Sequence, residues 1–143
     1  MLKIANVGKN DVVYDLGSGD GRIPITAAQR YGVRGVGIEI DSQLVQEANQ
    51  NAKAAGVSDR VQFRQQDLFG TDMSEATVVT LYLLTENNLK LRPKLLQELK
   101  PGTRIVSHNY DMGDWKPDRV EKLDGRTIYL WTVPENVPKH LRS

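Results

Sequence analysis

The stretch that decides the fold is residues 12–22, Val-Val-Tyr-Asp-Leu-Gly-Ser-Gly-Asp-Gly-Arg. Its apolar beginning is typical of a buried strand, and Asp15 marks the end of that strand. Gly17, Gly19 and Gly21 then predict a tight turn, because glycine adopts backbone conformations that other residues avoid. Such a turn brings backbone N–H groups and a helix N-terminus close to a ligand. The stretch therefore predicts a strand, a ligand-binding turn and a helix in succession.

The spacing of these glycines indicates which ligand the turn serves. The dinucleotide-binding fingerprint has its third glycine three positions after the second, where this chain has Arg22. Gly21 comes too early for that pattern, so a nicotinamide-dependent dehydrogenase remains only an outside alternative. A glycine-rich turn in some other α/β protein is also compatible with this segment taken alone.

Size and composition narrow the class of protein. A chain of 143 residues is expected to form a single domain over residues 1–143. Nineteen basic and eighteen acidic side chains give a net charge of +1 without a charge block, which gives no strong signal for nucleic acid. Cysteine is absent and histidine occurs twice, so we expect no metal site. No apolar run approaches the roughly 18 residues of a membrane span, and no signal peptide is visible, which favours a cytoplasmic protein.

Strands and helices alternate along the chain, which predicts an α/β fold with a doubly wound, mostly parallel sheet. The strands are expected at residues 11–15, 35–39, 61–66, 77–83 and 104–107, and the helices at residues 22–31, 41–55 and 86–99. Pro93 should break or restart the last of these helices. Residues 124–125, Asp-Gly, predict a hairpin between strands at 120–123 and 127–133. The tail, residues 134–143, is expected on the surface.

Three acidic residues stand at the ends of the first three predicted strands. They are Asp15, Glu39 and Asp67. In open α/β sheets, ligands bind outside the carboxyl ends of the strands, where the strand order reverses. A carboxylate at the end of the second strand can accept hydrogen bonds from both hydroxyls of a ribose. Each acid alone could instead cap a helix or face solvent, but three of them behind the glycine turn predict a nucleoside site.

These motifs resemble a known family. Residues 15–21, Glu39 and the block 66–69 resemble class I S-adenosylmethionine-dependent methyltransferases, and histone-lysine methyltransferases of the disruptor-of-silencing type share the Asp-Leu-Gly-Ser-Gly turn. Residues 14–22, with further motifs, resemble the seven-strand protein lysine methyltransferases whose mitochondrial members modify the c-subunit of ATP synthase and the adenine nucleotide translocase. The further motifs are residues 81–84, 91–93, 98–102, 104–107 and 115–117.

The resemblance covers residues 1 to about 118 and implies both fold and chemistry. The implied fold is a Rossmann-like sheet of seven strands ending in an antiparallel hairpin. The implied reaction is methylation of a protein lysine nitrogen by in-line transfer from S-adenosyl-L-methionine, with S-adenosyl-L-homocysteine as product. The implied cofactor-binding residues are Asp15, Gly17, Ser18, Gly19, Gly21, Glu39, Ile40, Asp67, Leu68 and Tyr82. Glu39 would hold the ribose and Asp67 the adenine amine, with the ring between Ile40 and Leu68.

The acceptor is expected over the ends of the fourth and fifth strands, where Tyr82, Thr85 and Glu86 are the candidate catalytic residues. Tyr82 could contact the acceptor amine or the methionine part of the cofactor, or be a core residue. Glu86 could attract a lysine, or only favour a helix start. No strong base is required, because burial lowers the pKa of an amine. His108 is expected to have a structural role. The alternative is that it acts as the base for another type of methyl acceptor.

The two tryptophans receive opposite interpretations. Trp115 lies in a polar loop, residues 109–117, and is expected to be exposed as a wall of the substrate site. Trp131 lies in the predicted hairpin and is expected in the core.

The chain departs from the family pattern in two places. Only about ten residues precede the first strand, where relatives carry a segment that covers the cofactor, and Thr85 stands where relatives often have proline. A homo-oligomer would be one way to cover the site. The alternatives are a methyltransferase for RNA or small molecules, and a cofactor-binding module without activity of its own. RNA is disfavoured by the near-neutral charge and by the lack of an Asn/Asp-Pro-Pro-aromatic motif after the fourth strand.

Overall fold

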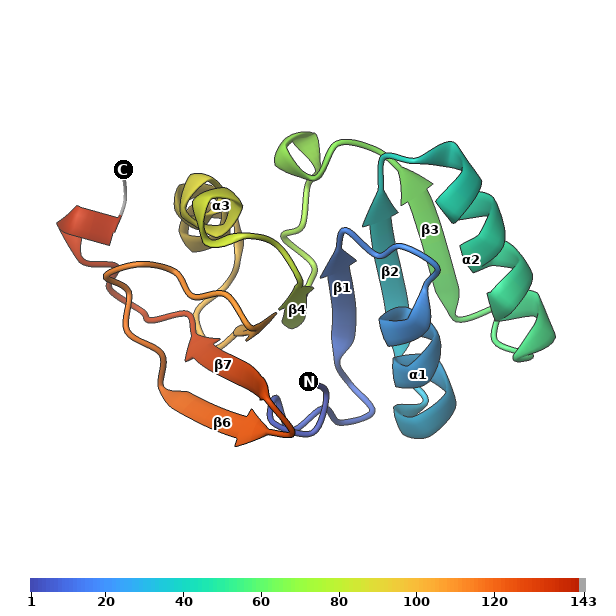
Figure 1. Ribbon diagram of the computed structural model, residues 1–143, viewed down its shortest axis with the longest axis horizontal. Coiled ribbons are helices and arrows are strands. Elements are labelled where there is room, and N and C mark those ends of the chain that lie inside the picture. Colours follow the sequence, from blue (N-terminus) through green and yellow to red (C-terminus); the bar gives the residue numbers. More distant parts are fainter. Residues whose placement is uncertain (142–143) are drawn as a thin grey trace.

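The strands form one mixed sheet in the order β3-β2-β1-β4-β5-β7-β6, in a computed structural model that describes residues 1–141 (Figure 1). Their bounds are β1 Val12–Leu16, β2 Arg34–Glu39, β3 Val61–Gln65, β4 Val78–Leu81, β5 Arg104–His108, β6 Arg119–Leu123 and β7 Arg126–Thr132. Strands β1 to β5 pair in parallel, whereas β7 is antiparallel to both β5 and β6. The predicted doubly wound sheet with a C-terminal hairpin is confirmed, and its order reverses between β1 and β4.

Helices cover both faces of this sheet. They are α1 Arg22–Tyr31, α2 Ser42–Ala54 and α3 Thr85–Glu98, with short 3₁₀ helices η1 Leu68–Gly70 and η2 Lys139–Leu141. Alternate residues of a strand point to opposite faces. Val13 and Val78 therefore pack on the side of α1, while Leu16 and Leu81 pack on the side of α3. No helix within the described part of the chain is long and apolar enough to cross a membrane.

The first residues of the chain pack against the face of the sheet that carries α1. Leu2, Ile4, Ala5 and Val7 are buried in the cluster that also contains Val13 of β1. Figure 1 shows this segment in dark blue between α1 and the β6–β7 hairpin.

Pro93 lies inside α3, so the expectation that it breaks the helix is wrong. A proline in a helix interior costs about 3 kcal/mol, because it removes one hydrogen bond and crowds the preceding turn. Leu91, Leu95 and Leu96 of the same helix are buried, and each contributes roughly 1.5–3 kcal/mol. Packing of this apolar face therefore outweighs the cost of the proline.

Strand β4 ends at Leu81, two residues before the predicted end at residue 83. Leu81 pairs with Leu16, the last residue of β1, so no residue of β1 remains to pair with Tyr82. Tyr82 follows the last paired residue of β4, and its ring lies beside the ring of His108 at the end of β5.

Trp115 is buried, which overturns the prediction that it forms an exposed wall of the substrate site. Its ring centroid lies 5.9 Å from that of Trp131, and the Trp131 Nε1–H donates to the Trp115 carbonyl oxygen at 2.8 Å. Burial of a large aromatic ring is strongly favourable, and the loop after β5 folds over the α3 face to achieve it. Trp131 is fully buried, as predicted.

The tail after β7 is only partly on the surface. Most residues from 134 to 140 are exposed, but Leu141 of η2 is buried in the cluster that contains Leu91 and Leu95. The expectation of a surface tail is therefore wrong at this point, because an apolar side chain returns to cover α3. Residues 142–143, also part of that expectation, lie outside the described residues.

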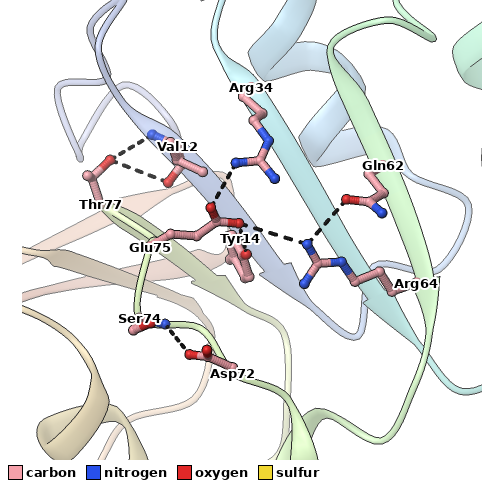
Figure 2. A network of polar contacts seen from close by, with 9 residues as sticks. All are labelled: Val12, Tyr14, Arg34, Gln62, Arg64, Asp72, Ser74, Glu75 and Thr77. Atoms are coloured by element: carbon pink, nitrogen blue, oxygen red, sulfur yellow. Dashed lines mark hydrogen bonds and ion pairs between the residues drawn. The ribbon is translucent and has the colours of Figure 1, made fainter.

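A polar network ties the segment before β4 to the first three strands (Figure 2). The Tyr14 hydroxyl donates to Glu75 Oε1, Arg34 Nη1 lies 2.9 Å from Glu75 Oε2, and Arg64 Nη2 lies 3.8 Å from Glu75 Oε1. Burial raises the pKa of Tyr14 to about 12, with the Glu75 hydrogen bond acting in the same direction. Tyr14 is therefore a neutral donor, and the network holds the β3–β4 connection close to the sheet.

Candidate cofactor and acceptor site

The glycine turn between β1 and α1 has the conformation that its sequence predicts. Gly17, Gly19 and Gly21 have φ angles of 82°, 56° and 88°, which residues with a side chain rarely adopt. The N–H groups of Gly17 and Ser18 donate to the Ile38 carbonyl oxygen of β2 at 2.8 and 3.0 Å. The turn is thereby fastened to the neighbouring strand, and its Gly21 N–H donates to the Ser18 carbonyl oxygen at 3.0 Å.

Close packing behind the turn requires glycine for a second reason. A Cβ atom on Gly21 would lie 2.6 Å from the Phe63 ring, and one on Gly37 would lie 2.6 Å from both Phe63 and Ser18 Oγ. The Ser18 hydroxyl is buried here without a hydrogen-bond partner among the described residues. Phe63 of β3 thus supports the turn from the side away from the ligand.

The three predicted acids lie along the same edge of the sheet. Glu39 accepts hydrogen bonds from the N–H groups of Gly19 (2.8 Å) and Asp41 (3.2 Å). Asp67 accepts from the Phe69 N–H at 3.0 Å and so begins η1, which is the helix-capping role that the sequence left open. Asp15 accepts from the Thr80 hydroxyl at 2.8 Å and is buried.

Asp15 has the most perturbed carboxyl group of the three. Burial raises its pKa to about 7, the Thr80 hydrogen bond opposes this, and the negative charges of Glu39 and Asp20 reinforce it. A carboxylate in this position is poorly solvated and unpaired with a cation. It is therefore suited to binding a positively charged group of a ligand.

Two hollows meet at Gly17. The first, here called the turn hollow, has a volume of about 470 Å³ and is lined by Asp15, the turn, Tyr82 and His108 among others. The second, the acid hollow, has about 340 Å³ and is lined by Glu39, Asp67 and apolar side chains. Ile40 and Leu68 both line the acid hollow, and the Ile40 side chain is 65% exposed. Together the hollows offer a polar end, a pair of carboxylates and an apolar slot.

The acceptor-side candidates are placed differently from one another. Tyr82 lines the turn hollow and is 60% exposed, so the alternative of a core tyrosine is wrong. Its ring lies 4.4 Å from the His108 ring in an edge-to-face arrangement, and 6.4 Å from the Tyr110 ring. Thr85 and Glu86 lie at the start of α3, outside the linings of both hollows, and the Thr85 hydroxyl donates to Asp111 Oδ1 at 3.4 Å. Glu86 is exposed in the first helical turn, as its helix-start interpretation requires.

Sequence reasoning missed the contribution of the hairpin to the turn hollow. Arg126 and Ile128 of β7 line it, because β7 inserts beside β5 and pairs Ile128 with His108. Burial, together with the positive charge of Arg126, lowers the pKa of His108 and so favours its neutral imidazole. The Asp-Gly turn predicted the hairpin, but only the register of β5 with β7 brings these residues to the site.

The sheet order, the glycine turn and the strand-end carboxylates define an S-adenosylmethionine-dependent methyltransferase of the seven-strand class, and comparison with solved structures agrees. An RNA methyltransferase from Salinibacter ruber in complex with S-adenosyl-L-homocysteine has 60% sequence identity and a TM-score of 0.97, with 99% of this chain and 93% of that chain covered. An S-adenosylmethionine-dependent methyltransferase from Thiobacillus denitrificans, also in complex with S-adenosyl-L-homocysteine, has 28% identity and a TM-score of 0.63, with coverage of 75% and 45%.

The chain belongs to the ANTKMT methyltransferase domain family, whose model matches residues 15–119. The protein-lysine N-methyltransferase of Saccharolobus islandicus (strain REY15A) is 47% identical over 95% of this chain and 88% of its own length. The adenine nucleotide translocase lysine N-methyltransferase of Mus musculus is 35% identical over 92% of this chain. The chain spans little more than half the length of that mouse relative (57%).

Proposed function

We propose that this protein transfers a methyl group from S-adenosyl-L-methionine to the side-chain amine of lysine in a protein. The observation that carries the proposal is the exposed aromatic wall of the turn hollow, formed by Tyr82 and His108 beside the glycine turn. A long aliphatic amine fits such an uncharged wall. The name and 47% identity of the S. islandicus relative support the same acceptor.

The two hollows fit the cofactor. The unobstructed space at Gly19 lets a ligand approach its backbone, and Glu39 offers a carboxylate for the ribose hydroxyls. Ile40 and Leu68 would flank the adenine, with Asp67 accepting from its amine, while Asp15 and the residues of the turn, Ser18 included, would hold the methionine end. When bound, the cofactor supplies a sulfonium methyl group that is already activated for attack.

The residues around the acceptor have to deliver a neutral amine and exclude water. Burial against the side chains of Tyr82 and His108 would lower the pKa of a lysine amine, because a charged ammonium is poorly solvated there. Tyr82 would also orient the amine through its hydroxyl. Thr85 and Glu86 would act at the rim, where the Glu86 carboxylate attracts the incoming cation. Alignment and desolvation are then the main contributions of the protein to catalysis.

RNA is the second candidate acceptor, because the S. ruber structure with 60% identity carries the name RNA methyltransferase. The segment after β4, Tyr-Leu-Leu-Thr-Glu, lacks the Asn/Asp-Pro-Pro-aromatic motif that suits base amines. The chain also has a net charge of only +1. These features favour protein over RNA.

The test gives the purified protein methyl-labelled cofactor together with a cell lysate, defined lysine peptides and total RNA. We expect label on the ε-amine of lysine, located by mass spectrometry of protein digests. The Asp15→Ala variant should neither bind S-adenosyl-L-homocysteine nor transfer label. Label confined to RNA or to a small amine would refute the lysine acceptor.

A further inference from the structure

A groove leads away from the turn hollow along the face of the sheet that carries α1. It has a volume of about 370 Å³ and lies between α1, the N-terminal segment and the β6–β7 hairpin. This flank groove and the turn hollow share Met1, Arg22, Ile23 and Ile128 as lining residues. The groove is therefore continuous with the site where the acceptor must dock.

The register of the hairpin explains which side chains line the flank groove. Glu121 pairs with Ile128 and Leu123 pairs with Arg126, so these four side chains share the face that carries α1. Leu123 is 59% exposed there, and Ile4 is among the buried residues beneath. The groove thus has an aliphatic floor and an exposed aliphatic wall.

Positive charge collects along the groove without acidic partners. Two of the charged residues that line the groove already have partners: Arg22 pairs with Asp20 at 3.0 Å, and Glu121 pairs with Arg119. Lys3, Arg30 and Arg126 are exposed and form no ion pair with any of residues 1–141. Among the described residues that line the groove, the basic side chains of Lys3, Arg22 and Arg30 outnumber the single acidic one, Glu121.

We propose that the flank groove binds the polypeptide next to the acceptor lysine and selects acidic residues there. The proposal rests on the proposed function, because it needs a protein acceptor. An aliphatic floor beside unpaired cations is complementary to a peptide with mixed apolar and carboxylate side chains. Single-stranded RNA is a poorer match, since its recognition relies on stacking platforms and the groove has one aromatic residue, Tyr31.

The experiment compares three peptides that differ only in the residues beside one lysine, which are acidic, neutral or basic. For the wild-type protein we expect kcat/KM to be about tenfold higher for the acidic peptide than for the basic one, with the difference shrinking as salt increases. The double variant Lys3→Glu/Arg30→Glu should reverse this order. Its affinity for S-adenosyl-L-homocysteine, measured by calorimetry, should stay at the wild-type value.

The control variant is Lys53→Glu/Lys100→Glu, which changes the net charge equally but alters exposed residues outside the turn hollow and the groove. It should keep the wild-type order of peptides. Equal kcat/KM values for all three peptides would overturn the proposed role of the groove, as would a reversed order of peptides in the control variant. Neither result would contradict lysine as the acceptor.

Binding without turnover separates the two proposals. Fluorescence anisotropy with peptides whose acceptor lysine is replaced by methionine should again favour the acidic peptide and depend on Lys3 and Arg30. Such binding with no transfer to any lysine peptide would support the groove and refute the proposed function. Transfer to RNA alone, lost in the same double variant, would overturn both. If the wild-type protein sediments as a dimer and the double variant as a monomer, the groove binds a second copy of this chain. That result would overturn the proposal that the groove binds the acceptor polypeptide.

Discussion

The two halves of the site are built in different ways. The cofactor region comprises the ends of β1 to β3 with the glycine turn, and much of its geometry depends on backbone groups such as the N–H of Gly19. The proposed acceptor region comprises the ends of β4, β5 and β7, where exposed side chains such as Tyr82 line the turn hollow. Backbone geometry accepts few substitutions, whereas exposed side chains can be exchanged without loss of the fold. A common cofactor and a changeable acceptor follow from this difference.

A large loss of cofactor affinity is expected from Glu39→Ala in the cofactor region. It removes the acceptor of two backbone hydrogen bonds, from Gly19 and Asp41, together with the proposed ribose contact. Hydrogen bonds to charged groups contribute roughly 1.5–3 kcal/mol each, so the affinity for S-adenosyl-L-homocysteine should fall at least about a hundredfold in calorimetry.

Glu47→Ala is the matched control, because Glu47 is an exposed acid of α2 that lines neither hollow. Wild-type affinity in the Glu39 variant would show that the cofactor region does not depend on this carboxylate.

The next effect concerns the pH dependence of stability without cofactor. The pKa of Asp15 is about 7 in the folded protein and 3.8 in its reference state, so the folded form binds the proton more tightly. The corresponding stabilisation is present below about pH 4 and is lost as pH rises through 7. At 1.36 kcal/mol per pKa unit, this loss is about 4 kcal/mol as an upper value.

Asp15→Asn removes the titrating group while keeping its shape. Denaturant unfolding between pH 5 and pH 9 should therefore show a flatter pH profile in the variant and higher stability at pH 8. The affinity for the cofactor should fall in the variant, because asparagine lacks the negative charge that would bind the methionine amino group. Parallel pH profiles of the two proteins would show that Asp15 is ionised throughout.

The smallest effect is expected in the acceptor region, from Tyr82→Ala. Since Tyr82 is 60% exposed and lies outside the sheet, stability should be nearly unchanged. We expect kcat/KM for a lysine peptide to fall about tenfold, which corresponds to loss of one modest contact, with S-adenosyl-L-homocysteine affinity altered at most a few-fold.

Tyr82→Phe separates the hydroxyl from the ring and should retain part of this activity. If cofactor affinity instead falls as much as kcat/KM, Tyr82 belongs to the cofactor region as well, and the boundary between the two regions moves.

The accuracy of sequence-based prediction differs along the chain for a physical reason. The glycine turn, the hairpin and the order of elements depend on local rules, such as positive φ at Gly21, and these predictions are confirmed. Trp115 and Pro93 were misjudged because burial against distant residues outweighed the local pattern. Arg126 and Ile128 could not be found beforehand, because strand register and not sequence spacing brings them to the turn hollow.

By itself, the sequence determined the class of fold and the class of cofactor. Residues 12–22 form a strand and a turn whose backbone conformation follows from the glycine positions. Glu39 stands at the end of the next strand, which follows from its place along the chain. Only the tertiary structure decided the surroundings of the acceptor. There, β7 inserts beside β5, Tyr82 projects past the end of β4, and the N-terminal segment packs on the α1 face with Met1 lining the turn hollow. These arrangements depend on how separate elements bury their apolar faces against one another, and that balance is settled only when the whole chain packs.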